Sequence, residues 1–224
     1  MLTLHRAALV LPDPADPTAP SFADGAVLVR GELVEAVGPF GDLAAAHPGA
    51  RVRDWGAAVL TPGLRNPYGH WLLERAYHPD PREEIGVEPV PDGLTGPSGP
   101  ADDARCGASA RRGLQRMLGF GVTAVAGPFG RAAVRTAVAR SGLSVVAVGE
   151  RSGSGAGAGP LDPLAVLPLA AAVHGRVVVG GRADFAVFAV FTASVAGGGG
   201  AGARPLPGGC LATVLGGRLV YRRR

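Results

Sequence analysis

The sequence contains no lysine, and all 22 of its basic residues are arginine. Isoleucine, asparagine and glutamine occur once each, as Ile85, Asn66 and Gln115, whereas glycine (36) and proline (20) are abundant. This bias is typical of a GC-rich bacterial genome, so most of the arginines need no functional explanation. The glycines have no three-residue period, which excludes a collagen helix.

Cysteine is also scarce, with only Cys106 and Cys210 in 224 residues. Two distant cysteines form neither a zinc motif nor a disulfide framework, so we expect a cytoplasmic protein. No signal peptide and no membrane helix are expected, and therefore no membrane partner. The net charge is only +4, and no aromatic residues alternate with the arginines, so we expect no nucleic-acid binding.

The hydrophobic content of 47% and the charged content of 18% suit a globular core. Short apolar runs between glycines and prolines predict β structure at both ends of the chain. The central part alternates helix and strand, which favours parallel pairing through right-handed crossovers. We predict an α/β fold in which the β segments of residues 1–60 and 175–224 pair in one sheet layer, because neither end has enough strands to bury its own face. Residues 61–174 form the central α/β piece.

The central piece is predicted to hold strands at about 58–66, 122–127 and 143–149, the last two of a buried type. Helices are predicted over 104–118, 131–140 and 162–173, with Asp162 as the N-cap of the third. Two irregular segments interrupt it, a proline-rich loop over 78–103 and a glycine-rich linker over 151–160.

Several motifs carry a family resemblance. The run from Asp24-Gly25 to Val37-Gly38 and the run Leu60-Thr61-Pro62-Gly63-Leu64 resemble the N-terminus of the amidohydrolase superfamily. The runs 180–185 and 214–221 resemble its C-terminus. Within it, the branch of imidazolonepropionase and aminodeoxyfutalosine deaminase is the most similar. The resemblance implies a composite β-sandwich, a metal-bearing (β/α) barrel and hydrolysis of a non-peptide carbon–nitrogen bond.

The chain departs from this family at the metal ligands. The family places His-x-His after the first barrel strand, whereas this sequence reads Tyr68-Gly69-His70. The later histidine and aspartate ligands have no counterpart, because His174 follows the last helix and Asp184 belongs to a Gly-Arg-Ala-Asp turn. Three strands cannot close an eight-stranded barrel. The resemblance therefore implies a composite β-sandwich of residues 1–60 and 175–224 and a truncated barrel remnant of residues 61–174. Without lysine, the carbamylated lysine of binuclear members cannot exist, although the branch resembled is mononuclear.

Two groups of residues are candidates for a site. His70, Glu74 and His78 are spaced i, i+4, i+8, and on one helix they would offer two nitrogens and an oxygen to a zinc or iron ion. The alternative is a short helix between Gly69 and Pro79 with an ordinary solvated face. His70 and Glu150 also follow strands, so a catalytic pocket at the sheet edge is a hypothesis; the alternative is that both are rim residues.

The sequence therefore predicts an amidohydrolase-like protein that has lost most metal ligands, is non-catalytic, needs no cofactor and acts by association or by binding a small ligand. The alternative is a reduced hydrolase with one zinc or iron ion. The missing barrel strands leave sheet edges that need a cover. We expect the loop 78–103 to cover one, and a second copy or a full-length amidohydrolase to cover another.

Overall fold

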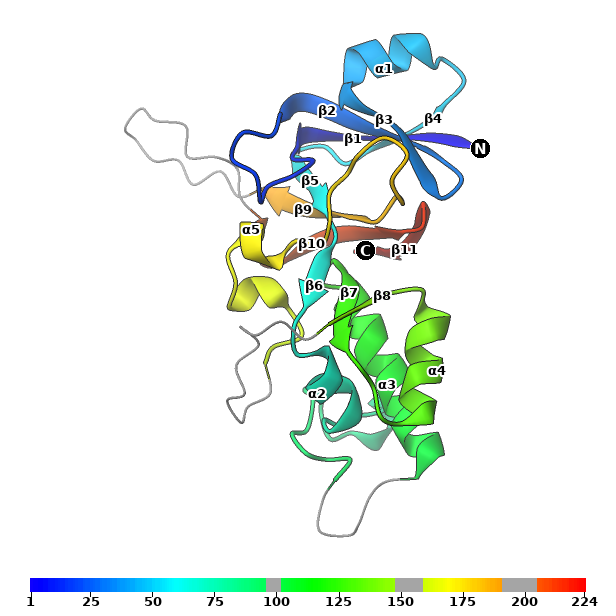
Figure 1. Ribbon diagram of the computed structural model, residues 1–224, viewed down its shortest axis with the longest axis vertical. Coiled ribbons are helices and arrows are strands. Elements are labelled where there is room, and N and C mark those ends of the chain that lie inside the picture. The colour runs from blue at the N-terminus through cyan, green and yellow to red at the C-terminus, as the bar shows by residue number, and fades with distance from the viewer. Residues whose placement is uncertain (96–101, 148–158, 191–204) are drawn as a thin grey trace, which may run out of the picture.

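The computed structural model describes residues 1–95, 102–147, 159–190 and 205–224. These residues form two sheets, a large one built from both ends of the chain and a small parallel one that carries most of the helical structure (Figure 1). The α/β class predicted from the sequence is confirmed, and the described strands form no closed barrel.

The large sheet joins N-terminal and C-terminal strands in the order β11-β10-β9-β5-β1-β2-β3, with β4 beside β1. The junction lies between β5 and β9, where Leu60 stands opposite Val187 in an antiparallel pair. The bounds are β1 Leu2–Val10, β2 Phe22–Arg30, β3 Leu33–Pro39, β4 Arg51–Asp54, β5 Ala58–Pro62, β9 Phe185–Val190, β10 Pro205–Leu215 and β11 Arg218–Arg222.

The sheet curls so that its two ends share a core. Val29 and Val34 of β2 and β3 belong to the same buried cluster as Phe185, Val187 and Val214 of β9 and β10. The edge of β3 reaches the turn before β9, because Val34 N donates to Gly181 O at 2.9 Å. On the opposite face, helix α1 (Phe40–Ala46) covers the apolar side chains of β1 and β2.

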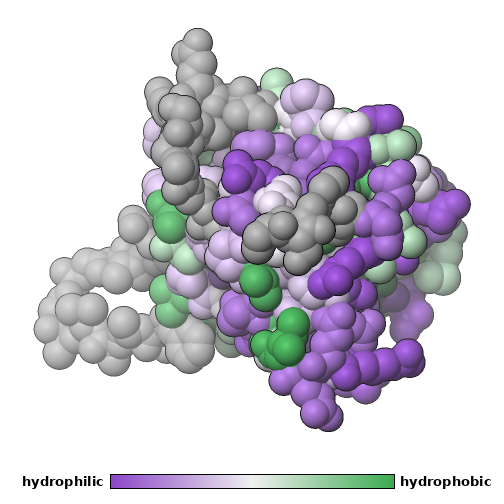
Figure 2. Space-filling model, turned by 90° about the horizontal axis from the view of Figure 1, so that it is seen from below, coloured by the Kyte–Doolittle hydropathy of each residue, from purple (hydrophilic) through white to green (hydrophobic). Residues whose placement is uncertain are grey.

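The small sheet has three parallel strands in the order β6-β7-β8, as predicted for the barrel remnant. They are β6 (Leu64–Asn66), β7 (Val122–Gly127) and β8 (Ser144–Ala147), and they pack with helices α2 (Gly69–Glu74), α3 (Asp103–Leu118) and α4 (Ala132–Ser141). The surface seen from below in Figure 2 is mostly hydrophilic, with separate small apolar patches.

Gly63 divides the strand predicted over 58–66 into two. β5 stays in the large sheet, and β6 enters the small one. A Cβ atom on Gly63 would lie 2.1 Å from Thr123 Oγ1, so only glycine lets the chain cross this closely over β7. Gly63 therefore connects the last residue of β5 in the large sheet to the first residue of β6 in the small sheet.

Two sequence predictions about elements are wrong. The helix over 162–173 is instead a short 3₁₀ helix, η2 (Pro163–Ala165), followed by α5 (Leu169–Ala172). Pro168 separates them, since it lacks the N–H that a continuous helix needs. Strand β8 is not of a buried type, because its residues alternate between half-buried and exposed, and Val145 is 54% exposed.

The loop predicted over 78–103 is described up to residue 95 and is held down rather than extended. A 3₁₀ helix, η1 (Pro81–Glu83), carries a capping box with Asp80, and Tyr77 and Val90 exchange backbone hydrogen bonds. Leu94 is fully buried beside Cys106 of α3. This part of the loop thus packs on the helical layer rather than on the edge strand β8. The segments 151–158 and 197–203 lie outside the described residues.

Candidate functional site

The end of β6 is fixed by the segment that precedes η2. Asn66 is fully buried, and its Nδ2 donates to Pro160 O at 3.1 Å and to Leu161 O at 3.0 Å. The Tyr68 ring lies so close to Gly159 that a Cβ there would come within 2.0 Å of it. Residues 159–161 therefore pack directly against the segment from Asn66 to Tyr68 at the end of β6.

His70 lies in the first turn of α2 and is half-buried. Gly69 lets this turn approach β7, since a Cβ on it would lie 2.9 Å from Val125. The Nδ1 atom of His70 is buried and has no hydrogen-bond partner in the described part of the chain. Imidazole nitrogens are common ligands of metal ions in proteins.

Glu74 ends α2 and serves the next helix. Its Oε1 accepts a hydrogen bond of 2.8 Å from the backbone N of Arg131, the residue that immediately precedes α4. A carboxylate at the start of a helix satisfies a free N–H and interacts favourably with the helix dipole. This contact gives Glu74 a structural role.

His78 lies beyond the end of α2 and is fully buried. Its Nε2 is 2.9 Å from Leu72 O, so this nitrogen carries the proton and donates it, and the backbone N–H donates to Ser109 Oγ at 2.9 Å. Burial lowers the pKa of His78 to about 4, and Arg116 and Arg112 add to the effect. The neutral ring thus fills the interface between α2 and α3.

The structure does not bring the proposed metal ligands together. Helix α2 ends at Glu74, so His70, Glu74 and His78 do not share one helix face. Within the described ranges, no three His, Cys, Asp or Glu side chains are grouped so that they could hold a metal ion. Glu150, the other catalytic candidate, lies outside the described residues.

Sequence reasoning missed a charged cluster between the two sheets. His174 is half-buried, and its backbone N donates to Gly63 O at 2.7 Å. Burial lowers the pKa of His174, Arg65 lowers it further, and Asp184 opposes both effects. Arg65 Nε is buried with no hydrogen-bond partner among the described residues. The one available signal was an arginine within the buried strand that follows the Pro-Gly-Leu motif.

Asp184 has the structural role predicted for its motif. Its Oδ1 accepts from Gly216 N at 2.7 Å, and its Oδ2 is 2.9 Å from Arg182 Nη1. Burial raises the pKa of Asp184, while the Gly216 hydrogen bond and Arg182 oppose the shift. The carboxylate therefore ties the start of β9 to the β10–β11 turn rather than serving a metal.

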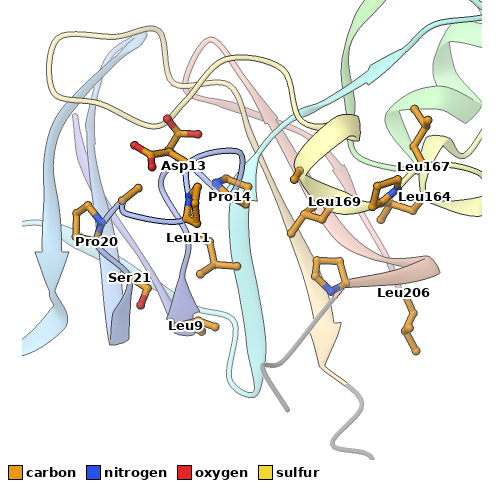
Figure 3. A pocket seen from close by; sticks show the side chains of 16 residues that line it. Leu9, Leu11, Asp13, Pro14, Pro20, Ser21, Leu164, Leu167, Leu169 and Leu206 are labelled. Carbon is orange, nitrogen blue, oxygen red and sulfur yellow. The ribbon is translucent and has the colours of Figure 1, made fainter. Parts of the chain in front are cut away.

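A pocket of about 740 Å³ lies elsewhere, between the loop after β1 and the segment containing η2 and α5 (Figure 3). Its walls are mainly leucine and proline, including Leu11, Leu164 and Leu169, and its acidic side chains are Asp13 and Asp16. A pocket of this size and composition suits a small apolar ligand. The described candidates His70, Glu74 and His78 do not line it.

Similar solved structures include an ochratoxinase and two deaminases. Guanine deaminase from Bradyrhizobium japonicum is 18% identical, with a TM-score of 0.47, and the match covers 65% of this chain and 34% of that one. Ochratoxinase from A. niger is 19% identical, with a TM-score of 0.44, and the match covers 65% of this chain and 31% of that one. A zinc-bound adenosine deaminase from Xanthomonas campestris is 21% identical, with a TM-score of 0.41, and the match covers 64% of this chain and 33% of that one. The chain spans about a third of the length of these proteins.

No curated protein sequence matches the chain. The family model of the bacterial imidazolonepropionase-like composite domain matches residues 25–50, which form most of β2, all of β3 and α1, and the turn that follows. This segment contains the Gly25 to Gly38 run, one of the runs that carry the resemblance. The chain is therefore similar to the imidazolonepropionase-like composite domain over residues 25–50, as the sequence predicted.

Proposed function

We propose that this amidohydrolase-like chain acts by associating with another protein chain rather than by catalysis. The observation that carries the proposal is strand β8. In the described part of the small sheet, β8 is an end strand that pairs only with β7, and its Val145 is 54% exposed. A free strand edge beside an exposed β-branched side chain is a template for pairing with another chain.

We propose a second copy of the chain as the partner, with a full-length amidohydrolase as the alternative. Two copies that met through β8 would each satisfy the other's edge N–H and C=O groups around a twofold axis. Neither cysteine forms a disulfide in the described part of the chain, which supports a reducing, cytoplasmic setting. No described helix is long and apolar enough to cross a membrane.

Light scattering on the whole chain tests this proposal. We expect a concentration-dependent dimer whose dissociation constant rises at least about tenfold in Val145→Lys, because a charge on the strand edge disfavours pairing. Val179→Lys is the control, since Val179 is 67% exposed and lies outside β8. A strict monomer at all concentrations contradicts self-association, as does equal weakening by both variants.

A second candidate, a reduced hydrolase with one zinc or iron ion, is favoured by the unpartnered Nδ1 of His70. The other residues do not fit such a site. Tyr68 is packed against Gly159, Glu74 caps α4, and His78 lies in the α2–α3 interface.

Elemental analysis of protein purified without an affinity tag separates the two candidates. We expect less than stoichiometric zinc and iron. One equivalent of either metal that disappears in His70→Ala and persists in His47→Ala would contradict the non-catalytic proposal. The control residue His47 is the C-cap of α1, in the large-sheet half of the molecule.

A further inference from the structure

Three arginines lie near the stacked rings of His5 and Trp55, namely Arg51 and Arg53 of β4 and Arg222 of β11. In the parallel pairing of β1 with β4, Thr3 stands opposite Arg51 and His5 opposite Arg53. Residues two apart on a strand share a face, so both arginines lie on the His5 face of the sheet. Arg222, near the end of β11, has its guanidinium carbon 5.9 Å from the centre of the Trp55 ring.

The cluster of Arg51, Arg53 and Arg222 has no counter-charge in the described part of the chain. None of the three guanidinium groups makes a hydrogen bond or an ion pair with another described residue. Asp54, which follows Arg53 in the sequence, forms an ion pair with Arg6 instead, with 3.0 Å between Arg6 Nη1 and Asp54 Oδ2. Partial burial lowers the pKa of Arg53, and the charges of Arg51 and Arg222 lower it further.

The cluster adjoins two polar atoms that also lack partners. Trp55 Nε1 and His5 Nδ1 are both buried without a hydrogen bond to any described residue. The two rings are stacked, with centroids 6.1 Å apart, and His5 itself is only 1% exposed. Burial lowers the pKa of His5 to about 3, with Arg53 contributing, so His5 is neutral near pH 7 and adds no positive charge.

We propose that Arg51, Arg53 and Arg222 form a binding site for the phosphate group of a small molecule. Like charges held together without a counter-ion destabilise one another, and a doubly charged oxyanion removes that repulsion. Guanidinium groups present paired N–H donors that match phosphate oxygens. The neighbouring Trp55 makes the site observable, because a bound anion changes the surroundings of its ring.

Inorganic phosphate is the probe, and the full chain carrying Trp71→Phe is the protein, which leaves Trp55 as the sole tryptophan. At constant ionic strength, we expect a saturable change in Trp55 emission. Equilibrium dialysis with radiolabelled phosphate measures the same binding directly. Arg53→Gln and Arg222→Gln should each raise the dissociation constant about tenfold, the loss of one charge-assisted contact.

Arg140→Gln is the matched control, because Arg140 is also exposed but lies on α4, which packs with the small sheet. It should bind phosphate as well as the parent does. The proposal is overturned if dialysis detects no saturable phosphate binding, or if Arg140→Gln weakens binding as much as Arg53→Gln. Equal binding of acetate at the same ionic strength would overturn the selectivity for phosphate.

Discussion

Gly113 on α3 lies against the ring of His78, and a side chain has no room there. A Cβ would be 2.5 Å from Nε2 and 2.7 Å from Cδ2 of the histidine. The ring cannot move away without losing its 2.9 Å contact with Leu72 O. We therefore expect Gly113→Ala to lower the free energy of unfolding by about 1–3 kcal/mol, measured by urea denaturation.

Gly107 provides the control within the same helix. A Cβ on Gly107 would be 3.4 Å from the nearest atom, Ala133 Cβ, which is ordinary van der Waals contact. Gly107→Ala should therefore raise stability by up to about 1 kcal/mol, because alanine favours a helix over glycine. If both variants changed stability in the same direction and by the same amount, tight packing against His78 would not explain the first result.

Single residues show which roles could be predicted from sequence. Asp162 was expected as an N-cap, and its side chain accepts from Leu164 N at 2.9 Å and also from Gly208 N at 2.6 Å. The cap follows from local chemistry, whereas the contact with Gly208 joins residues 46 apart. The role of His78 was missed because spacing along the chain does not reveal that α2 ends four residues before it.

At the scale of elements, Asp184 links three connections. Its carboxylate accepts from Gly216 N between β10 and β11 and pairs with Arg182, and its backbone O accepts from Gly63 N at 3.3 Å between β5 and β6. Gly216 is buried, so its N–H would be left without an acceptor in Asp184→Ala. We expect that variant to lose about 1–3 kcal/mol in thermal or urea unfolding.

Asp42→Ala is the comparison for Asp184→Ala, since Asp42 is an exposed carboxylate in the first turn of α1. It should cost at most about 1 kcal/mol, the usual contribution of an exposed acid near a helix start. Equal losses in the two variants would mean that the link between the β10–β11 turn and β9 contributes little.

Elements with strong periodicity or clear boundaries were predicted well. Helix α3 runs over Asp103–Leu118 where 104–118 was expected, and β7 runs over Val122–Gly127 where 122–127 was expected. Strand β8 was found, but its burial was predicted wrongly, because an apolar run gives no information about how many neighbours the strand has. Edge position depends on the whole sheet and is not encoded locally.

At the scale of the whole molecule, the register of the composite sheet could not be derived from pattern alone. The pairing of β5 with β9 brings Val59 opposite Phe188, residues more than a hundred positions apart. The small number of strands at each end predicted that the two ends share one sheet layer. The family resemblance implied a composite domain, and the match over residues 25–50 supports that resemblance. The charged cluster at Arg65 and His174 arises from this joining of sheets, which explains why no local motif revealed it.

Each half of the molecule contains a buried neutral histidine, and these two histidines make the stability of the whole molecule sensitive to acid. His5 lies in the large sheet and His78 in the helical half, and burial lowers their pKa values to about 3 and about 4 from 6.5. Between these values and 6.5 the unfolded chain binds more protons than the folded one. The contribution of these two histidines to the free energy of unfolding is therefore fully present above pH 6.5 and is lost as the pH falls toward their pKa values in the folded state.

We expect each histidine to cost about 2–3 kcal/mol between pH 7 and pH 4.5, in addition to the effect of the carboxyl groups. His78→Gln keeps a donor for Leu72 O but cannot be protonated, so its loss of stability over this range should be smaller than that of the parent by about 2–3 kcal/mol. Urea denaturation at both pH values measures the difference, and the values at pH 7 correct for the change in packing. Parallel pH profiles for the two proteins would show that His78 is not held neutral in the folded state.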